Sequence, residues 1–438
     1  MIKRDKRAIL FGFLSAVTAS ILTVSSLHAE RVDMSRDDSA EKLEAYLKFT
    51  KIVSIIEDQY VDELNTSNII DKALKGLLSN LDAHSSFMDA KESKELQVQT
   101  NGEFGGLGIS VGMKDGALTV IAPIEGTPAD KAGLKSNDII LKIDDQATIG
   151  MTIDKAVSLM RGKPGTSIEL TVIRKGEMKP LVFKIVRDII EIKSVYTKRI
   201  GDDILYLRVT SFDQKVVSSM KRAIKSHPKT KGIVLDLRNN PGGLLNQAIG
   251  VVDMFIDEGI IVSQKGRVAS ENIVYNARKR GSDTKTPLVV LVNDGSASAS
   301  EIVSGSLQDH KRAIIIGTKT FGKGSVQVVM PVGNGESLRL TIARYYLPSG
   351  RTIQAVGVNP DIEVAYGEIK RVEDSITIKE KELQKHLENE LKKVDGVKSS
   401  RENSADKELI DEEKIYKDSQ LKSGVDILKA LMINNKYR

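Results

Sequence analysis

Four short apolar runs, rich in β-branched residues, alternate with helical patterns in the second half of this chain. They have the length and the uninterrupted hydrophobicity of strands buried on both faces, and they are Ile204–Val209, Gly232–Leu237, Leu288–Val292 and Ala313–Ile316. Helices are expected between them at about 215–226, 244–256 and 298–309. Strands separated by helices form a parallel sheet that the helices cover. The pattern therefore predicts an α/β core over residues 191–366.

The rest of the 438 residues differs in composition from this core, which predicts a multidomain α/β protein. Residues 42–94 carry apolar residues at helical spacing and are expected to form a helical N-terminal domain. Residues 95–190 contain short β-rich runs separated by Gly or Pro turns, with one helix over Ile153–Met160. This arrangement is typical of a compact, mainly β module.

Residues 367–438 are expected to form a charged helical tail, because more than half of the residues from 368 to 418 are charged, with both signs present. Leu383, Leu387 and Leu391 form a thin apolar stripe at helical spacing. Two interpretations stay open: a solvated helix or partly disordered tail, and a helix that docks on another subunit.

Residues 1–29 have the pattern of a signal peptide or N-terminal anchor. Four basic residues precede the apolar run Ala8–Leu27, and Leu27-His28-Ala29 offers a cleavage site that fits the small-residue rule poorly. The run is about long enough to span a bilayer if it stays uncut. We therefore expect an exported protein of the bacterial periplasm, soluble or anchored to the inner membrane by this segment. The alternative is a buried helix of the fold.

Composition excludes several kinds of site. The absence of cysteine excludes disulfides, thiol nucleophiles and thiolate zinc sites, and the five histidines show no metal-ligand spacing. Half of the net charge of +6 lies in residues 1–29, and aromatic residues make up 4% of the chain, so no nucleic-acid partner is expected. No cofactor or metal is implied.

Two familiar motifs match only in part. Gly108–Gly112 fits G-x-S-x-G, but the pattern continues as a strand, whereas a nucleophile elbow requires a sharp turn and a helix. Gly317–Gly324 nearly fits a phosphate-binding loop, but Gly324 replaces the Ser/Thr that binds Mg²⁺, and a strand-like segment follows. We interpret neither as a functional site.

Three other segments combine strand ends with small residues. In the first, Leu235–Gly243, a strand runs into a Gly-Gly turn that can bring backbone N–H groups close to a ligand. The second, Leu291–Glu301, places Ser298 at the start of a helix, where free N–H groups could stabilise an oxyanion formed by serine attack. Ser298 and Glu301 also fit an S-x-x-E capping box, so a purely structural role for Ser298 stays open.

The third segment, Thr320–Gln327, places Lys323 in a turn that enters a strand, near Phe321 and Val326. An ordinary lysine has a pKa of about 10.4 and is a poor base near neutral pH. Burial among apolar groups lowers that pKa and lets lysine accept a proton from serine. Gln327 lies four residues on, on the same side of an ideal strand, and could hold the lysine in place. A solvated loop lysine is the alternative.

Together, the sequences R-N-N-P-G-G, N-D-G-S-A-S-A-S-E and T-F-G-K-G-S-V-Q, in this order, resemble the C-terminal processing peptidases, or tail-specific proteases. The resemblance covers about residues 42–365, including the lead-in Leu81–Ser86. It implies that Ser298 is the nucleophile, Lys323 the general base and Gln327 the residue that orients the base.

The resemblance also implies an oxyanion hole, formed by the backbone N–H groups of Ala299 and Gly243. It identifies residues 95–190 as a PDZ domain, in which one loop holds the carboxylate of a peptide and the next strand adds the peptide as an extra strand. The residues that resemble this loop are Gly106, Leu107, Gly108 and Ile109.

Arg161 ends the predicted 153–160 helix of this module. One interpretation is a cation that is favourable at a helix C-terminus. The other is a positive charge placed near the bound peptide or the catalytic domain.

From these residues we expect an exported serine endopeptidase that recognises C-terminal ends of proteins through its PDZ domain and cleaves by a Ser-Lys dyad. Its expected partners are protein or peptide substrates with free C-termini, with a membrane tether at the N-terminus and a homo-oligomer through the helical ends as further expectations. The alternative is a catalytically silent PDZ scaffold. A trypsin-like PDZ protease would need a Ser-His-Asp triad, and no histidine accompanies the Ser298 segment.

Overall fold

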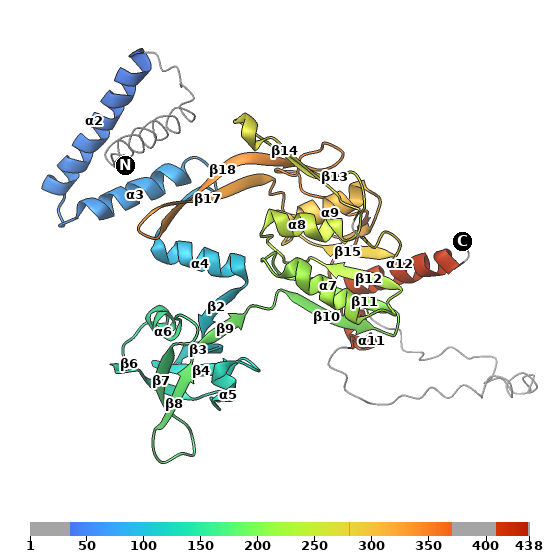
Figure 1. The fold of residues 1–438 in the computed structure, drawn as a ribbon, viewed down its shortest axis with the longest axis horizontal. Helices are drawn as coiled ribbons and strands as arrows, with labels where there is room; N and C mark the ends of the chain where they lie inside the picture. The colour runs from blue at the N-terminus through green and yellow to red at the C-terminus, as the bar shows by residue number, and fades with distance from the viewer. Residues whose placement is uncertain (1–35, 280, 370–408, 437–438) are drawn as a thin grey trace, which may run out of the picture. The chain divides into compact units, whose positions relative to one another are not determined.

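The computed structural model describes residues 36–279, 281–369 and 409–436 (Figure 1). The chain divides into two compact units, one ending at Leu81 and one beginning at Asp82. The predicted signal segment, residues 1–29, lies outside the described residues. None of the helices in the described ranges combines the length and the apolar character needed to cross a bilayer.

The described part of the N-terminal unit, from residue 36 on, contains the helices α2 (Arg36–Gln59) and α3 (Thr66–Ser79). Asn65 caps α3 by accepting a hydrogen bond from the Asn68 N–H at 2.9 Å. The division at Leu81 falls earlier than the predicted boundary at residue 94. The physical reason is that the residues just after it, β1 (Ser86–Met88), pair with a strand of the second unit.

The β module forms the predicted antiparallel sheet in the order β3-β4-β5-β7-β8, with β6 (Gln146–Ala147) beside β5. Its helix α6 covers Ile153–Met160, as the pattern predicts. Two further strands, β2 (Glu103–Gly106) before this sheet in the sequence and β9 (Asp188–Glu191) after it, pair with each other. The five main strands are Ile109–Lys114, Ala117–Pro123, Ile139–Ile143, Ser167–Ile173 and Leu181–Val186, and the short helix α5 covers Pro128–Lys131.

The second half of the chain contains the predicted α/β sheet, in the order β10-β11-β12-β15-β16-β19. All neighbours pair in parallel except β10 and β11. The six strands are Val195–Ile200, Ile204–Val209, Gly232–Asp236, Leu288–Val292, Ile314–Gly317 and Ile362–Glu363. The α/β fold class is therefore confirmed. The four predicted strands correspond to β11, β12, β15 and β16, with limits that agree to within one residue, whereas β10 and β19 were not predicted.

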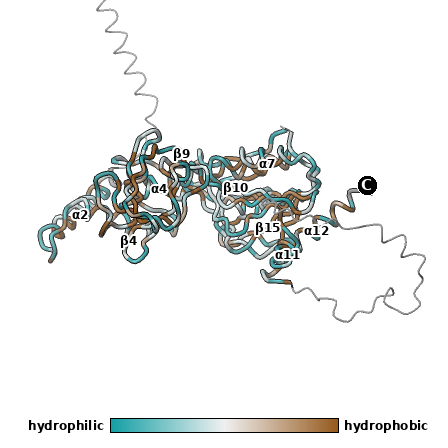
Figure 2. Tube along the Cα trace, turned by 90° about the horizontal axis from the view of Figure 1, so that it is seen from below, coloured by the Kyte–Doolittle hydropathy of each residue, from teal (hydrophilic) through white to brown (hydrophobic). Residues whose placement is uncertain are grey.

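Helices cover both faces of this sheet. Residues from α7 (Val216–Ser226), α8 (Leu245–Asp253) and α9 (Ala299–Asp309) share one apolar core with alternate residues of the strands. The intervening strand residues, such as Val234 and Leu291, face a second core. The most hydrophobic stretches of the trace run along the strands around β15 (Figure 2).

The second core is closed by the C-terminal segment, which contains α11 (Glu412–Tyr416) and α12 (Ser419–Lys436). Leu421, Val425 and Leu428 of α12 are buried against the sheet of their own chain. The described residues of this segment are therefore not a solvated tail, because the apolar face of α12 packs on the sheet and completes the second core. Docking on another subunit stays a prediction. Residues 370–408 of the predicted tail, with its leucine stripe, lie outside the described residues.

A second sheet, antiparallel and absent from the predictions, has the order β1-β18-β13-β14, with β17 also paired to β18. Its longest strands are β17 (Ser325–Gly333) and β18 (Glu336–Tyr346), and β13 (Ile260–Gly266) and β14 (Ile273–Asn276) extend it. The helix α4 (Ala90–Asn101) follows β1, and the short η1 (Ala269–Glu271) joins β13 to β14. β17 begins two residues after Lys323, so the loop that holds this lysine is attached to the second sheet. The segment Gly317–Gly324, which partly matches a phosphate-binding loop, is therefore followed by a strand and not by a helix.

Candidate active site

Ser298 lies between β15 and α9, at the N-cap of the helix. Its backbone has φ 54° and ψ −111°, a conformation that costs a non-glycine residue about 1–3 kcal/mol. Hydrogen bonds on either side hold this turn: the Ala297 N–H donates to the Asn240 carbonyl at 3.0 Å, and the buried Ser296 hydroxyl donates to the Leu237 carbonyl at 2.8 Å. The strained turn places the serine beyond the carboxyl end of β15, an interior strand of the sheet.

Glu301 is fully buried and accepts four hydrogen bonds through its carboxylate. Oε2 accepts from the backbone N–H groups of Ser298 and Lys323, both at 2.8 Å. Oε1 accepts from the Thr320 hydroxyl at 2.6 Å and from the Gly322 N–H at 2.7 Å. One oxygen atom therefore joins the Ser298 turn to the Lys323 loop. The sequence indicated Glu301 only as a helix cap, because its other partners lie about twenty residues away.

Lys323 is partly buried, and burial is the largest cause that holds the pKa of its ammonium below the usual value. The positive charge of Arg339 lowers this pKa further, and the negative charge of Asp82 opposes the shift. A lowered pKa is what a lysine needs if it is to act as a base near neutral pH. Phe321 does not contribute to the burial as expected, since it is 65% exposed, whereas Val326 is buried.

Gln327 belongs to β17, but Lys323 precedes this strand. A register shift between Val326 and Gln327 also interrupts the alternation of side chains. Strand alternation therefore does not relate the side chains of Lys323 and Gln327 in this part of the fold. The Gln327 amide donates to the hydroxyls of Ser325 at 2.9 Å and Thr341 at 3.2 Å, so its proposed role in orienting Lys323 stays a prediction.

A polar network leads from Gln327 to Asp82 in the turn that opens the second unit. The Thr341 hydroxyl donates to Asp82 Oδ1 at 3.2 Å, and the Ser85 hydroxyl donates to Asp82 Oδ2 at 2.7 Å. Burial raises the pKa of Asp82, but hydrogen bonds from Ser85, His84 and Thr341 outweigh it and leave the pKa below the usual value. Asp82 was part of the predicted lead-in, and the sequence assigned it no role at the site.

His84 follows Asp82 and lies within electrostatic reach of Lys323. Burial, and then the charge of Lys323, hold the pKa of His84 below its ordinary 6.5, against the opposing charge of Asp82. The imidazole is therefore neutral at neutral pH. Within the described residues it makes no hydrogen bond to Ser298.

The glycine turn of the first segment passes directly against the serine. A Cβ atom on Gly242 would lie 2.9 Å from the Cβ of Ser298 and 3.0 Å from the Ala299 nitrogen, and Gly242 has φ +106°, so a side chain is excluded there. The Gly242 N–H is already donated to Asn240 Oδ1 at 2.9 Å. Among the described residues, the N–H groups of Gly243 and Ala299 have no acceptor, which leaves the two predicted oxyanion donors free.

The predicted carboxylate loop lies between β2 and β3. Gly106 ends β2, Leu107 and Gly108 form the turn, and Ile109 begins β3. The carbonyls of Leu107 and Gly108 accept from the N–H groups of Ala129 and Ile124, at 2.9 and 2.8 Å. Since β3 is an edge strand of its sheet, it leaves one side for a peptide strand to add.

Arg161 is the C-cap of α6, as predicted. Its guanidinium lies over the ring of Phe104, 4.8 Å from the centroid. Phe104 belongs to β2, which leads into the loop at Gly106. Arg161 therefore contacts the strand that precedes the carboxylate loop, in addition to closing the helix.

The chain matches the models of three known families: Peptidase family S41 over residues 203–364, the PDZ domain over 119–174 and the Activating protease CtpB N-terminal domain over 12–92. It is 43% identical to a carboxy-terminal-processing protease of Bartonella bacilliformis, over 86% of this chain and 88% of the relative. It is also 34% identical to the carboxy-terminal processing protease CtpA of Bacillus subtilis, over 82% of this chain and 78% of the relative.

Among solved structures, it is similar to a photosystem II D1 C-terminal processing protease, with 28% identity, a TM-score of 0.42 and coverage of 73% of this chain and 92% of that one. The motifs, the sheet that carries them and the similarity to curated relatives over most of their length lead to the same assignment. The chain belongs to the S41 family of carboxy-terminal processing proteases.

Proposed function

We propose that this protein is an exported serine endopeptidase that uses a Ser298–Lys323 dyad to cleave proteins whose C-terminal ends its PDZ domain recognises. The observation that carries the proposal is the buried Glu301 carboxylate, whose Oε2 accepts the N–H groups of both dyad residues at 2.8 Å. A bond of this kind fixes the two backbones relative to each other, which a nucleophile and its base require.

In the proposed acylation, neutral Lys323 takes the proton of the Ser298 hydroxyl as Oγ attacks the peptide carbonyl carbon. The oxyanion accepts hydrogen bonds from the N–H groups of Gly243 and Ala299. The C–N bond then breaks, and the Lys323 ammonium returns the proton to the departing amine. The products of this half-reaction are an acyl ester on Ser298 and a free C-terminal fragment.

In deacylation, Lys323 takes a proton from water as the oxygen of that water attacks the ester carbon. The C–O bond to Ser298 breaks, and the proton moves from Lys323 to the serine oxygen. A lysine base makes a catalytic histidine unnecessary. No step requires a metal, and no group of three or more His, Asp or Glu side chains in the described part of the chain could hold one.

Substrate capture is proposed at the edge strand β3 and the loop that precedes it. A free peptide carboxylate would accept N–H groups of the Gly106–Ile109 loop, and the peptide backbone would pair with β3. The test compares a peptide ending in a free acid with the same peptide amidated, using the Ser298→Ala protein for binding and the wild type for cleavage. Loss of binding and of cleavage on amidation supports the proposal, and equal binding of both forms contradicts it.

Export and a membrane tether rest on the pattern of residues 1–29, and fractionation of cells that produce the full chain tests both. Exposed apolar residues on α2, including Leu43 and Leu47, support a homo-oligomer through the N-terminal end. The C-terminal end lacks that support, because α12 packs on its own chain. A silent PDZ scaffold would bind free-acid peptides but leave them uncut.

A further inference from the structure

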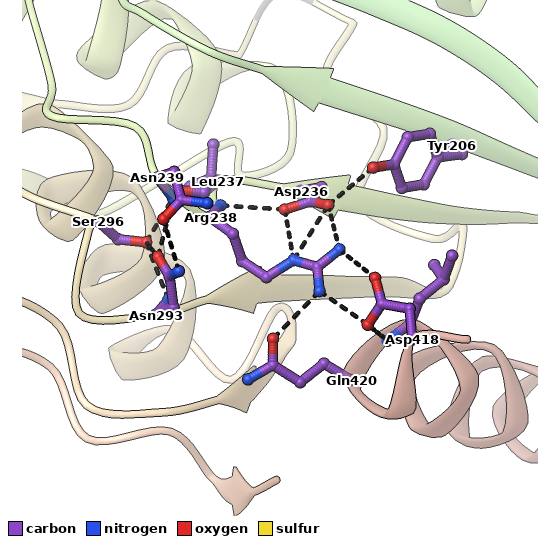
Figure 3. Close-up of polar contacts among 10 residues, drawn as sticks. Tyr206, Asp236, Leu237, Arg238, Asn239, Asn293, Ser296, Asp418 and Gln420 are labelled. Carbon is purple, nitrogen blue, oxygen red and sulfur yellow. Dashed lines mark hydrogen bonds and ion pairs between the residues drawn. The ribbon is translucent and has the colours of Figure 1, made fainter. Parts of the chain in front are cut away.

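The starting observation is a buried guanidinium that joins two segments 180 residues apart (Figure 3). Arg238 follows the end of β12, and its side chain is 9% exposed. One half of the guanidinium binds Asp236, with Nη2 2.6 Å from Oδ2 and Nε 3.0 Å from Oδ1. Asp236 is fully buried and also accepts the Tyr206 hydroxyl at 2.7 Å.

The other half of the guanidinium binds the C-terminal segment. Nη1 and Nη2 lie 2.9 and 2.8 Å from the two oxygens of Asp418, which makes this a bidentate ion pair. Nη1 also donates to Gln420 Oε1 at 3.1 Å. Asp418 and Gln420 are set by the start of α12: Asp418 accepts the Leu421 N–H at 3.0 Å, and the Gln420 amide donates to the Val364 carbonyl at 2.8 Å.

Arg238 is also the first residue of the loop that ends in the oxyanion glycines. The Asn239 N–H donates to Asn293 Oδ1 at 2.8 Å. The Asn240 carbonyl accepts the Ala297 N–H at 3.0 Å and the Ser300 hydroxyl at 2.9 Å, on either side of Ser298. A change in the position of Arg238 would therefore be passed to the loop that supplies Gly243, since only four residues lie between them and Asn239, Asn240 and Gly242 are hydrogen-bonded.

The C-terminal segment is held on the sheet independently of these polar contacts. A Cβ on Gly232 of β12 would lie 2.9 Å from the Leu428 side chain, and a Cβ on Gly424 of α12 would lie 3.1 Å from Leu291. Helix and sheet thus pack closely along the helix, away from Arg238. This separation allows the docking of α12 and its contact with Arg238 to be varied one at a time.

We propose that the C-terminal segment is a positioning element of the peptidase site, in which Asp418 and Gln420 hold Arg238 and thereby fix the oxyanion loop from Asn239 to Gly243. The inference rests on the proposed function, because the loop matters only if Gly243 serves the reaction. Asp418 and Gln420 touch no substrate and act through Arg238.

The test uses the full-length protein with four substitutions, each made separately. Asp418→Asn removes the charge that faces Arg238. Asp426→Asn is its matched control, since Asp426 pairs at the surface of the same helix with Lys422 and is 53% exposed. Leu428→Ala weakens the docking of α12 without touching Arg238. Gln420→Met removes one hydrogen-bond acceptor from Arg238 and keeps a side chain of similar length. It replaces Asp418→Asn in the test if that variant fails to fold.

The first readout is steady-state cleavage of a free-acid peptide, well below the melting temperature of each variant. Asp418→Asn is expected to lower kcat about ten- to hundredfold with KM within about twofold, as a displaced positioning group does. Asp426→Asn and Leu428→Ala are expected to keep the wild-type kcat. An unchanged kcat in Asp418→Asn, or an equal loss in Leu428→Ala, would overturn the proposal.

The second readout needs no activity: hydrogen exchange of the segment 238–244, whose amides donate to Asp236, Asn293, Asn240 and Phe212. Exchange there should accelerate in Asp418→Asn and not in Asp426→Asn, and unchanged exchange would overturn the proposal. If the wild type cleaves no peptide while exchange responds as expected, the proposed peptidase function fails and the Arg238 contact stands. The two failures are therefore distinguishable.

Discussion

At the scale of single residues, the fully buried Glu301 carboxylate accepts four hydrogen bonds in the site. Each bond has a charged acceptor and is worth about 1.5–3 kcal/mol. The carboxylate therefore does more than cap α9. It holds the strained Ser298 turn and the lysine loop in one arrangement.

Glu301→Gln is expected to reduce kcat by at least about a hundredfold and to lower the free energy of unfolding by about 2–4 kcal/mol. The reason is that the amide nitrogen is a donor and cannot accept the two hydrogen bonds that the carboxylate oxygen in its place accepts. Peptide kinetics and denaturant unfolding measure the two effects. The exposed Glu363→Gln is the control and should change neither. Wild-type kcat in Glu301→Gln would show that this carboxylate does not organise the dyad.

The pH dependence of the rate tests the charges around Lys323. A base must be neutral, so kcat/KM should rise with pH through the pKa of Lys323, which burial lowers. Asp82 raises this pKa and Arg339 lowers it. Asp82→Asn should therefore shift the rise to lower pH, and Arg339→Gln should shift it to higher pH.

His84→Gln is the control for that experiment, because burial holds the pKa of His84 below its ordinary value and His84 is not among the groups that shift the pKa of Lys323. It should leave the rise in place. Shifts of the same sign in Asp82→Asn and Arg339→Gln would contradict Lys323 as the group that titrates.

At the scale of elements, α6 and β2 of the PDZ domain meet through Arg161 and Phe104. Both residues are partly buried, and a cation over an aromatic ring contributes at least about 0.5–1 kcal/mol. Arg161→Ala is therefore expected to weaken the binding of a free-acid peptide about two- to fivefold, measured by titration in the Ser298→Ala background. Lys163→Ala, which changes an exposed cation two residues on, should have no effect. If cleavage falls while binding holds, Arg161 acts on the peptidase site instead.

The helix α12 stabilises the peptidase sheet through its apolar face. Leu428 is fully buried, so Leu428→Ala should lower the free energy of unfolding by about 2–5 kcal/mol through the cavity that it creates. Ile433→Ala, at an exposed position of the same helix, should cost less than about 0.5 kcal/mol. Denaturant unfolding compares them, and equal stability of the two variants would mean that α12 is not part of the folded core.

At the scale of the whole molecule, the α/β sheet could be predicted because each buried strand is an uninterrupted apolar run and each helix has its own apolar period. The antiparallel sheet could not, since β13 and β18 pair residues about eighty positions apart and neither strand is an uninterrupted buried run or a regular alternation. The docked segment was missed because the charged stretch 368–418 led to one prediction for all of 367–438, although the apolar residues Leu421, Val425 and Leu428 lie beyond that stretch.

In the candidate site, too, some residues could be predicted from the sequence, whereas the contacts between them could not. Ser298 and Lys323 stand in local motifs, and the sequence indicated both. The contacts that join them could not be predicted, because Glu301 reaches Lys323 across 22 residues and the Thr341 hydroxyl reaches Asp82 across 259. Such contacts depend on which strands become neighbours, and no local pattern encodes that.

The central claim is that Ser298 is a nucleophile activated by Lys323. The most direct measurement is the rate at which a fluorophosphonate probe modifies the full-length protein, with the modified residue located by mass spectrometry. We predict one adduct, on Ser298, formed rapidly in the wild type and not in Lys323→Ala or Lys323→Arg, because arginine stays protonated. An adduct on another residue, or wild-type labelling in Lys323→Arg, would contradict the account.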